Sequence, residues 1–485
     1  MTWACCVDVG STFTKAVSVG LGGARPSVAG SPTDGSVLAT AARPTTSTTD
    51  VLTGLDGVVA DLTAVVGSPP SETLVCSSAG GGLRLAVVGH ERAVTAEAGH
   101  RVGLSAGAKV VHVSAGRLDQ AAVAELRAAR PDVLLVVGGT DGGNAEVLRH
   151  NVSRLARARL SVPVVLAGNA EVTDELADVL RSSGRTVVTA ANVLPRIGVL
   201  EAGSAREAIR EVFLRHVIGG KGLSRGPRFA SLVRAATPDA VLSGVEALAD
   251  GHDDAGPGAG DVLVVDVGGA TTDVYSVVTP HGEDAELRRA VVATLWRART
   301  VEGDLGVRWG AAGVVDAAVT EGLLQGAEAD RLGAAAARRV GDPGWVPATA
   351  ADRADDVALA AAAVTVGLRR HARPAGSGGT GRDLRRVRVV VGSGGVLRHA
   401  DATARAAILA AATGDHGGRW RVPSAPEVVV DVDAVLFAAG LLTPHRPATA
   451  ARLAAAVLRT EGRARPLPAA DPPAPRRPLW QDRDR

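Results

Sequence analysis

The sequence predicts an α/β protein of several domains, and three observations lead to this prediction. Short apolar runs rich in β-branched residues are each followed by a cluster of glycines, which is typical of buried strands that end in tight turns. Strands and helices alternate from about residue 109 to residue 225. A motif of buried strand, aspartate and glycine occurs once near the start and once in the second half. At 485 residues, the chain also exceeds the size of one hydrophobic core.

The alternating region predicts an inserted domain with its own parallel, doubly wound sheet. Its expected strands are KVVHV, DVLLVVG, VPVVLAG and TVVTA, and its helices should begin near Leu118, Asn144, Glu171 and Ser204. The loops Gly138–Gly143 and Gly168-Asn169 fall at the carboxyl ends of these strands, where open α/β sheets bind ligands. Turn geometry alone also accounts for them, and we favour that interpretation.

Composition fits a globular protein. Hydrophobic residues make up 46% of the chain and charged residues 21%, and the formal net charge of +2 gives no electrostatic reason to expect nucleic-acid binding. The cysteines Cys5, Cys6 and Cys76 lack the spacing of a disulfide framework, a zinc site or an iron-sulfur site. No apolar stretch is long enough for a membrane helix, and MTWACCVDVGS lacks a basic start and a cleavage site. We therefore expect a cytoplasmic protein that does not bind membranes.

The expected domain organisation follows from these shifts in pattern. Residues 1–105 form the N-terminal part of a first domain, and residues 106–225 form the inserted domain. Residues 226–260 return to the first domain and include a linker, GHDDAGPGAG. A second domain covers residues 261–460. Residues 461–485 are Pro-rich and charged, which predicts a disordered tail.

The first candidate site is VDVGSTFTKA, in which a buried strand delivers Asp8 into a Gly turn followed by hydroxyl residues. Gly10 would let the backbone approach a phosphate, and amides around Ser11 and Thr12 would donate to its oxygens. Asp8 would orient Mg²⁺ through water, and Lys15 would add positive charge. An ordinary strand-Asp-Gly turn gives the same pattern, so this motif alone leaves both interpretations open.

VLVVDVGGATTDVYSV repeats the pattern in the second half of the chain, and two such hairpins form a phosphate clamp. Asp266 is suited to hold Mg²⁺ through water or to position the attacking water, so the two strand-end aspartates are the catalytic candidates. Gly268, Gly269 and Thr271 would grip the β- and γ-phosphates with their amides, and Thr272 belongs to the same binding set.

The third candidate element is VVVGSGGVLRH, a strand that leads into a Gly-rich loop and a helix. Glycines allow the close approach of an adenosine, which makes Gly392, Ser393, Gly394 and Gly395 nucleotide-binding candidates. A Gly loop that opens a helix also serves packing alone, so the order of the three elements carries the prediction.

This order resembles the actin, sugar-kinase and heat-shock-chaperone ATPase superfamily over most of Thr2 to Leu442. The resemblance implies two ribonuclease-H-like domains that close on Mg-ATP. In that superfamily a Gly/Asp-bearing helix start after the second hairpin also approaches the nucleotide, and RTVEGDLG falls in that place. Glu302, Gly303 and Asp304 are therefore candidates, although an N-capped amphipathic helix would carry the same acids.

A narrower resemblance spans nearly the whole chain. It is to the glutamate-mutase MutL family, which is unrelated to the mismatch-repair protein of the same short name. The strings that carry it are CSSAGGGLRLAVVG, GGTDGGN, LAGN, NVLPRIGVLE, DVGGATTDVYS, RTVEGDLGVR and GSGGVLRH. The resemblance implies an ATP-dependent reactivating chaperone whose partner is an adenosylcobalamin-dependent mutase, and it implies slow hydrolysis coupled to protein remodelling.

Three other functions of the same superfamily are alternatives for this chain. A small-molecule kinase would need a general base facing an acceptor pocket, and no sugar-pocket cluster is evident. A filament or scaffold protein would use ATP only to control its assembly. An activator of radical dehydratases would need a cysteine-held cluster, and this chain lacks the cysteines.

Overall fold

The chain forms two compact units in this computed structural model. Unit 1 comprises Met1–Ala79, Ala240–Val278 and Arg299–Arg485, and unit 2 comprises Gly80–Asp239 and Thr279–Ala298. The structure describes residues 2–22, 33–46, 49–79, 83–96, 98–99, 102–103, 108–158, 160–213, 215, 223–279, 297–373, 382–413 and 420–459. The tail expected at 461–485 lies outside the described residues.

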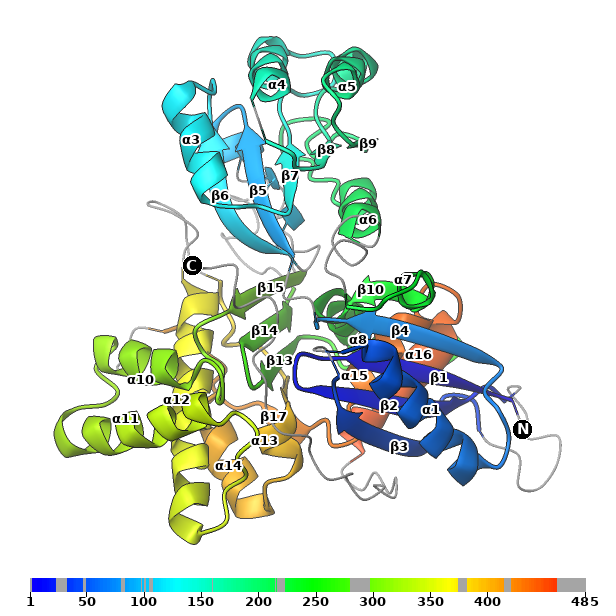
Figure 1. The fold of residues 1–485 in the computed structure, drawn as a ribbon, viewed down its shortest axis with the longest axis vertical. Coiled ribbons are helices and arrows are strands. Elements are labelled where there is room, and N and C mark those ends of the chain that lie inside the picture. The colour runs from blue at the N-terminus through cyan, green and yellow to red at the C-terminus, as the bar shows by residue number, and fades with distance from the viewer. Residues whose placement is uncertain are drawn as a thin grey trace. The chain divides into compact units, whose positions relative to one another are not determined.

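The first half of unit 1 contains a sheet with the strand order β4-β1-β2-β3. Its strands are β1 (Trp3–Val9), β2 (Phe13–Gly20), β3 (Val37–Pro44) and β4 (Glu72–Ser77). β2 runs antiparallel to both β1 and β3, whereas β4 runs parallel to β1. Helix α1 (Val51–Val66) covers one face, and α15 (Val435–Leu442) contacts β1 and β4 (Figure 1). Every residue of β1 is buried as a result.

The second half of unit 1 repeats this topology. Its sheet has the order β15-β14-β13-β16-β17. The strands are β13 (Val262–Val267), β14 (Thr272–Val277), β15 (Arg297–Glu302), β16 (Val389–Ser393) and β17 (Glu427–Val430). β13 pairs antiparallel with β14 and parallel with β16, as β1 does with β2 and β4. The two central strands, β1 and β13, are therefore topologically equivalent.

The remaining elements of unit 1 are mostly helices. They are α8 (Thr237–Asp250), α10 (Ala311–Thr320), α11 (Gly326–Gly341), α12 (Ala350–Ala372), α13 (Gly395–Arg398), α14 (Ala402–Ala410), α16 (Pro447–Ala454) and η5 (Ala455–Leu458), with the short strands β11 (Gly251–His252) and β12 (Gly256–Pro257). α12 begins with a capping box between Thr349 and Asp352, which satisfies amides that the first turn leaves without helical partners. Residues 226–260, expected to hold a linker, thus include all of α8 and the small β11–β12 hairpin.

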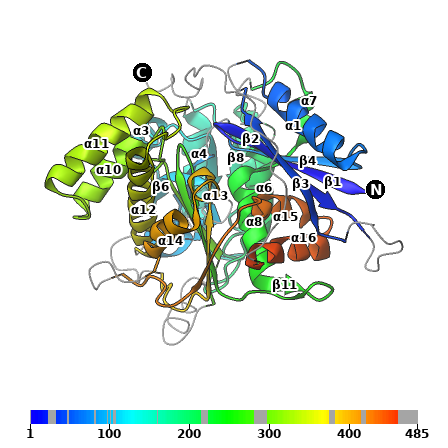
Figure 2. The same cartoon turned by 90° about the horizontal axis from the view of Figure 1, so that it is seen from below.

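Helices α8 and α15 cross at glycines, which allow their backbones to touch (Figure 2). A Cβ on Gly440 would lie 1.7 Å from the carbonyl oxygen of Ala240, and one on Gly244 would lie 1.9 Å from that of Leu436. No side chain fits at either position without moving a helix. Because α8 leads into the second half and α15 returns to the first, this crossing is where the chain passes between the halves.

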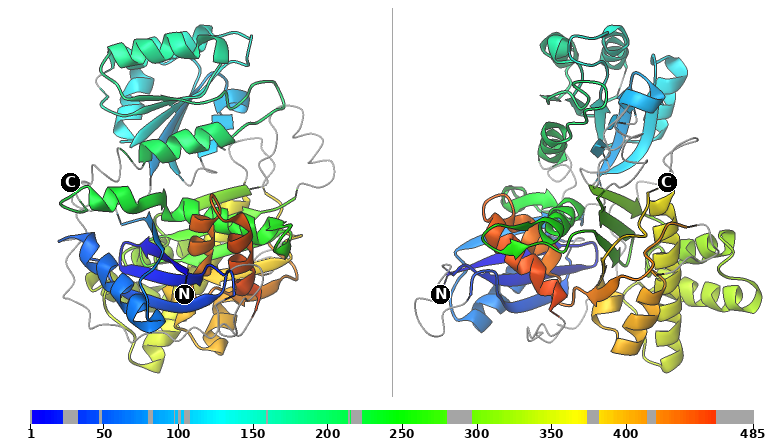
Figure 3. Two further views of the ribbon diagram at one scale, coloured as in Figure 1. Left: turned by 90° about the vertical axis from the view of Figure 1, so that its right-hand side faces the viewer. Right: turned by 180° about the vertical axis from the view of Figure 1, so that it is seen from behind.

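Unit 2 is built on a parallel sheet with the order β6-β5-β7-β8-β9. Its strands are β5 (Arg84–Gly89), β6 (Lys109–Ala115), β7 (Val133–Val136), β8 (Val164–Leu166) and β9 (Val187–Thr189), and β10 (Val233–Ala236) follows later in the chain. Its helices are η1 (Arg92–Ala96), α3 (Gln120–Ala128), α4 (Glu146–Arg157), η2 (Ala170–Val172), α5 (Thr173–Ser182), α6 (Gly203–Val212) and α7 (Arg228–Leu232). α4 and α5 lie on one face and α6 on the other (Figure 3).

The boundary of unit 2 differs from the expected domain boundary. The sequence places residues 1–105 in the first domain, but β5 is an inner strand of the unit 2 sheet, between β6 and β7. The change of unit occurs at Gly80 instead of residue 106. Strand β4 ends at Ser77 and strand β5 begins at Arg84, so both strands fall before residue 106.

The α8–α15 crossing predicts opposite effects for two glycine-to-alanine changes. Gly440→Ala should lower the free energy of unfolding by about 1 to 3 kcal/mol, because the added methyl overlaps the backbone of α8. Gly333→Ala in α11, where an added Cβ meets nothing within 4 Å, should raise it by about 0.5 to 1 kcal/mol. Urea unfolding measures both. Equal shifts for the two variants would contradict the role of Gly440 at the crossing.

Candidate functional site

The first hairpin is the turn between β1 and β2. Asp8 and Lys15 are register partners on these strands, so their side chains leave the sheet on the same face beside the turn. The amide of Gly10 donates to the carbonyl oxygen of Phe13 at 3.1 Å. A Cβ at Gly10 would lie 2.8 Å from that oxygen, so the turn requires glycine, and it presents Ser11–Thr12 at its tip.

The second hairpin, between β13 and β14, has the same geometry. The amide of Gly268 donates to the carbonyl oxygen of Thr271 at 2.9 Å, and a Cβ at Gly268 would again lie 2.8 Å from the oxygen. Asp266 and Asp273 are the register partners beside this turn. The Gly268 amide is engaged inside the turn, so a phosphate here would meet the amides that follow, those of Gly269 and Thr271 among them.

The tips of the two hairpins face each other. A Cβ on Gly269 would lie 3.6 Å from Oγ1 of Thr12, which belongs to the other hairpin. Both strand-end carboxylates also act electrostatically on Tyr275 of β14, the register partner of Val264. Burial raises the pKa of the Tyr275 phenol well above its ordinary value, and the charges of Asp266 and Asp8 are among those that raise it further.

The aspartates of the site fall into two kinds. Asp8 is buried and accepts a weak hydrogen bond from the Cys76 thiol at 3.8 Å, while Asp266 is half-buried. Asp273 instead forms an ion pair with the buried Arg299 guanidinium at 3.2 Å. Burial raises the pKa of Asp273, and Arg299 opposes that shift. Arg299 therefore holds Asp273 in a structural ion pair, whereas Asp8 and Asp266 are the two equivalent carboxylates at strand ends.

Hairpin two is backed by the segment Leu305–Arg308. The amides of Val307 and Arg308 donate to two carbonyls of the turn, at 3.0 and 2.9 Å. The Thr272 hydroxyl, expected to bind nucleotide, is buried and donates to the carbonyl oxygen of Leu305 at 2.6 Å. Its hydrogen is engaged with the backbone, so Thr272 anchors the hairpin to this segment.

The acids of RTVEGDLG do not lie at a helix start. Glu302 is the last residue of β15, which is the edge strand of its sheet. Helix α10 begins only at Ala311. Arg370 of α12 binds both Glu302 and Asp304, at 2.8 and 2.7 Å. Burial raises the pKa of Glu302, and the hydrogen bond from Arg370 opposes it. These two acids are thus tied to α12.

The Gly392–Gly395 loop depends on glycine at two positions for different reasons. Gly394 has a φ of +104°, and a Cβ there would lie 2.1 Å from the carbonyl oxygen of Val267, so the loop presses against the end of β13. A Cβ on Gly392 would meet leucine methyl groups at 2.9 Å, which is a packing constraint. Gly395 opens α13, and an added Cβ there meets nothing within 4 Å.

This loop belongs to the same region as the hairpins. Ser393, the last residue of β16, is the register partner of Asp266. Burial lowers the pKa of His399, just after α13, and Lys15 of hairpin one is among the positive charges that lower it further. The structure therefore brings together the three elements that the sequence singles out.

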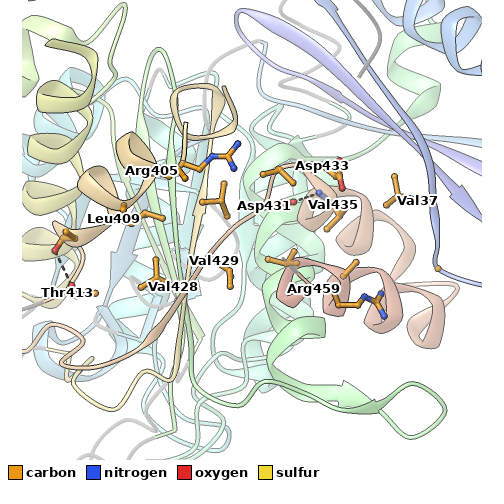
Figure 4. Close-up of a pocket in the computed structure, with 18 of the residues that line it drawn as sticks. Val37, Arg405, Leu409, Thr413, Val428, Val429, Asp431, Asp433, Val435 and Arg459 are labelled. Atoms are coloured by element: carbon orange, nitrogen blue, oxygen red, sulfur yellow. Dashed lines mark hydrogen bonds between the residues drawn. The ribbon is translucent and has the colours of Figure 1, made fainter. Parts of the chain in front are cut away.

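A cavity of about 680 Å³ in unit 1 is lined by none of these candidates, although the amide of its lining residue Asp431 donates to the carbonyl oxygen of Gly392 at 2.9 Å (Figure 4). Its labelled lining residues are Val37, Arg405, Leu409, Thr413, Val428, Val429, Asp431, Asp433, Val435 and Arg459. The Asp431 carboxylate accepts from the first amides of α15, at 2.8 and 3.1 Å. Burial and the nearby Asp431 raise the pKa of Asp433 to about 6, although Arg398 opposes the shift.

Asp433 predicts a pH-dependent contribution to stability. Because its pKa is raised in the folded state, the folded chain binds more protons here than the unfolded chain between about pH 4 and 6. Protonated Asp433 therefore contributes to the stability of the folded state at low pH, and this contribution is lost as the pH rises through about 6. Urea unfolding of wild type and Asp433→Asn from pH 4.5 to 7.5 should show the wild-type advantage shrinking as the pH rises. A difference independent of pH would contradict the raised pKa.

The described ranges hold neither a cluster of metal-ligating side chains nor a membrane-spanning helix. No three or more His, Cys, Asp or Glu side chains in these ranges gather as a metal-holding group. Among the described helices, none combines the length and apolar character needed to cross a membrane.

Sequence reasoning missed several residues that hold the site. Arg299, Arg370 and Arg308 each bind a carboxylate contributed by another element. Tyr275, the single tyrosine of the chain, lies under Arg299, whose guanidinium carbon is 5.4 Å from the ring centroid. Arg299 begins the RTVEGDLG string and Arg308 ends the longer RTVEGDLGVR string, so these motifs were the available signal.

A model of a protein family described as MutL protein matches residues 4–458. The chain belongs to the MutL family. Protein MutL from Clostridium tetanomorphum is 34% identical over 463 residues, which cover 92% of this chain and 97% of the relative. Membership of the MutL family confirms the narrower resemblance seen in the sequence.

Solved structures resemble this MutL-family chain only distantly. A nucleotide-free acetone carboxylase shares 14% identity at a TM-score of 0.32, and the match covers 80% of this chain but 64% of the carboxylase chain. A carbohydrate kinase from Novosphingobium aromaticivorans shares 13% sequence identity at a TM-score of 0.28, and the match covers 95% of this chain and 99% of the kinase chain. Xylulose kinase from Bifidobacterium adolescentis shares 11% sequence identity at a TM-score of 0.25, and the match covers 90% of this chain and 99% of the kinase chain.

Proposed function

We propose that this chain binds Mg-ATP between its two hairpins and the Gly392–Gly395 loop, and that slow ATP hydrolysis drives the reactivation of an adenosylcobalamin-dependent mutase such as glutamate mutase. The two halves of unit 1 would then be ribonuclease-H-like domains of the actin-like type. One observation carries the nucleotide part of the proposal: two hairpins with the same glycine-closed turn meet tip to tip, at Thr12 and Gly269.

Each element has a role in nucleotide binding. The backbone amides at Ser11 and Thr12 and those at Gly269 and Thr271 would hold the phosphates from two sides. Such a grip uses fixed dipoles and needs no side-chain rearrangement. The positive charge of Lys15 lies on the strand next to Asp8 and would attract the same group.

The adenosine would lie against the Gly392–Gly395 loop. Gly394 presses on the carbonyl of Val267, so the loop leaves no room for a side chain at that point. At Gly395, an added Cβ meets nothing within 4 Å, so the first turn of α13 is open to a ligand. The acids Glu302 and Asp304 remain outer candidates because Arg370 already binds both.

Asp8 and Asp266 fit a magnesium ion held through water. Both donors are carboxylate oxygens, which Mg²⁺ prefers, and an ion held by these two acids through water would keep most of its water shell. Bound there, Mg²⁺ would neutralise charge on the phosphates. Asp266 is the more exposed of the two carboxylates and is therefore the better placed to orient an attacking water.

The mutase part of the proposal rests on family membership and on the sequence resemblance. Adenosylcobalamin enzymes hold their cofactor tightly and lose activity when the adenosyl group is lost, so exchange needs a partner that favours an open mutase. Nucleotide can supply that bias only if the ATP-bound and ADP-bound forms bind the mutase with different strengths. A difference of about 1 to 3 kcal/mol is typical of such coupling.

Asp266→Ala should keep Mg-ATP binding and slow hydrolysis by about 100-fold or more, the scale expected for losing a group that acts on the transition state. Calorimetry measures binding, and phosphate release measures turnover. Asp330→Ala, a change on the exposed side of α11, is the matched control and should alter neither. Turnover unchanged in Asp266→Ala would remove its catalytic role. Failure of wild type to bind nucleotide would refute the ATP site as a whole.

Inactivated mutase mixed with fresh adenosylcobalamin and this protein should regain turnover with ATP, and should not regain it with ADP or with the Asp266→Ala variant. The physical reason is the differential affinity described above. Recovery is followed as mutase turnover. If no cobalamin mutase from the same cell recovers with ATP, and phosphate is instead transferred to a small acceptor, the chain is a small-molecule kinase.

A further inference from the structure

Arg308 borders the space in which the two hairpins face each other. Its amide donates to the carbonyl oxygen of Gly269 at 2.9 Å. A Cβ placed on Gly269 would lie 3.6 Å from Cβ of Arg308 and 3.7 Å from its Cγ, and 3.6 Å from Oγ1 of Thr12. The stem of the Arg308 side chain and the tip of hairpin one therefore adjoin the same point.

The guanidinium of Arg308 is held away from that point by Asp356 of α12. Its two terminal nitrogens donate to the two carboxylate oxygens, at 3.1 and 2.8 Å. This is the bidentate geometry that arginine also uses toward phosphate. Only 18% of the Arg308 side chain and 9% of the Asp356 side chain are exposed, so solvent screens the pair weakly.

Asp356 has a second cation. The buried Arg339 of α11 donates from Nε to the same carboxylate at 2.6 Å, and its other nitrogens reach the carbonyl oxygens of Ala335 and Asp352 at 2.8 and 3.0 Å. Two guanidinium groups thus share one carboxylate. If Arg308 leaves, Asp356 keeps a buried partner, so departure does not create the uncompensated charge that makes breaking a buried pair costly.

We propose that Arg308 is the residue that distinguishes nucleoside triphosphate from diphosphate, by exchanging Asp356 for the terminal phosphate at hairpin two. The inference rests on the proposed nucleotide site. Asp356 competes with the phosphate for the same guanidinium, and it therefore lowers the affinity for triphosphate. A diphosphate lacks the terminal group and leaves the Arg308–Asp356 pair intact.

The same exchange links the nucleotide to the helical layer. Arg308 lies at the end of the segment that backs hairpin two, while Asp356 and Arg339 belong to α12 and α11, which pack against each other (Figure 1). The indole of Trp345 lies over the Arg339 guanidinium, 4.9 Å from its carbon to the ring centroid. Release of Arg308 would therefore change the contacts that join these two helices to the hairpin.

The test compares the two ends of the pair. Calorimetry with Mg²⁺ and either a non-hydrolysable ATP analogue or ADP gives the affinity ratio for each variant. Arg308→Gln should weaken binding of the ATP analogue about 10-fold, the scale of one charge-assisted hydrogen-bonded contact, and change ADP binding far less. Asp356→Asn removes the competitor and should shift the ratio the other way, toward the ATP analogue.

Asp355→Asn is the matched control. This neighbour on α12 pairs with Arg331 of α11, an arginine with half of its side chain exposed, and it should leave the ratio at the wild-type value. A structural role for the Arg308–Asp356 pair would weaken both nucleotides together and leave the ratio unchanged in both variants, which would overturn the inference.

The outcomes separate this inference from the proposed function. Wild type that binds nucleotide while Arg308→Gln keeps the wild-type ratio refutes the role of Arg308 alone. Wild type that binds neither nucleotide refutes the site itself, and the inference with it. Thermal melts establish that each variant is folded. If Asp356→Asn does not fold, the ratio of ATP-analogue affinity to ADP affinity in Arg308→Gln decides whether the inference holds.

Discussion

One backbone hydrogen bond, made twice, constrains the centre of this protein. In each half of unit 1 a glycine amide donates to the carbonyl three residues later, and the turn is so tight that a Cβ on Gly10 or Gly268 would touch that oxygen. The turn fixes the register of the strands that enter and leave it. It thereby places Asp8 and Asp266 at equivalent positions, each two residues before its glycine, and the tips approach each other where the Thr12 side chain meets Gly269.

The site could be predicted from the sequence to the extent that it is made of local backbone patterns. Strand, aspartate and glycine recur in order, and the Gly392–Gly395 loop follows them, so the three elements are visible in one chain. The contacts that hold them are not local. Arg308 and Asp356 lie 48 residues apart, and Arg370 and Glu302 lie 68 apart, and such pairs leave no periodic trace. The same limit hid the engagement of Thr272 with the backbone.

Arginine, far more common here than lysine, is used around the site in ways that lysine could not match. Arg370 binds two acids at once, Arg308 grips both oxygens of Asp356, and Arg299 pairs with Asp273 while lying over an aromatic ring. These contacts need a planar group with several donors, whereas an ammonium is a single point of charge. A composition that looks like simple bias in the sequence thus supplies the bridges between strands and helices.

The passage of α15 back onto β1 has a consequence for biosynthesis. The thiol of Cys6 meets the carbonyl of Ala438, a contact across 432 residues, so the first strand made is completed by one of the last helices made. At ribosomal rates of about 5 to 20 residues per second, this takes about 20 to 90 s. Throughout that interval the nascent chain carries an apolar strand whose cover has not yet been synthesised. Long-range closure of this kind slows folding and favours aggregation, so expression yield should depend on cellular chaperones that shield the first strand.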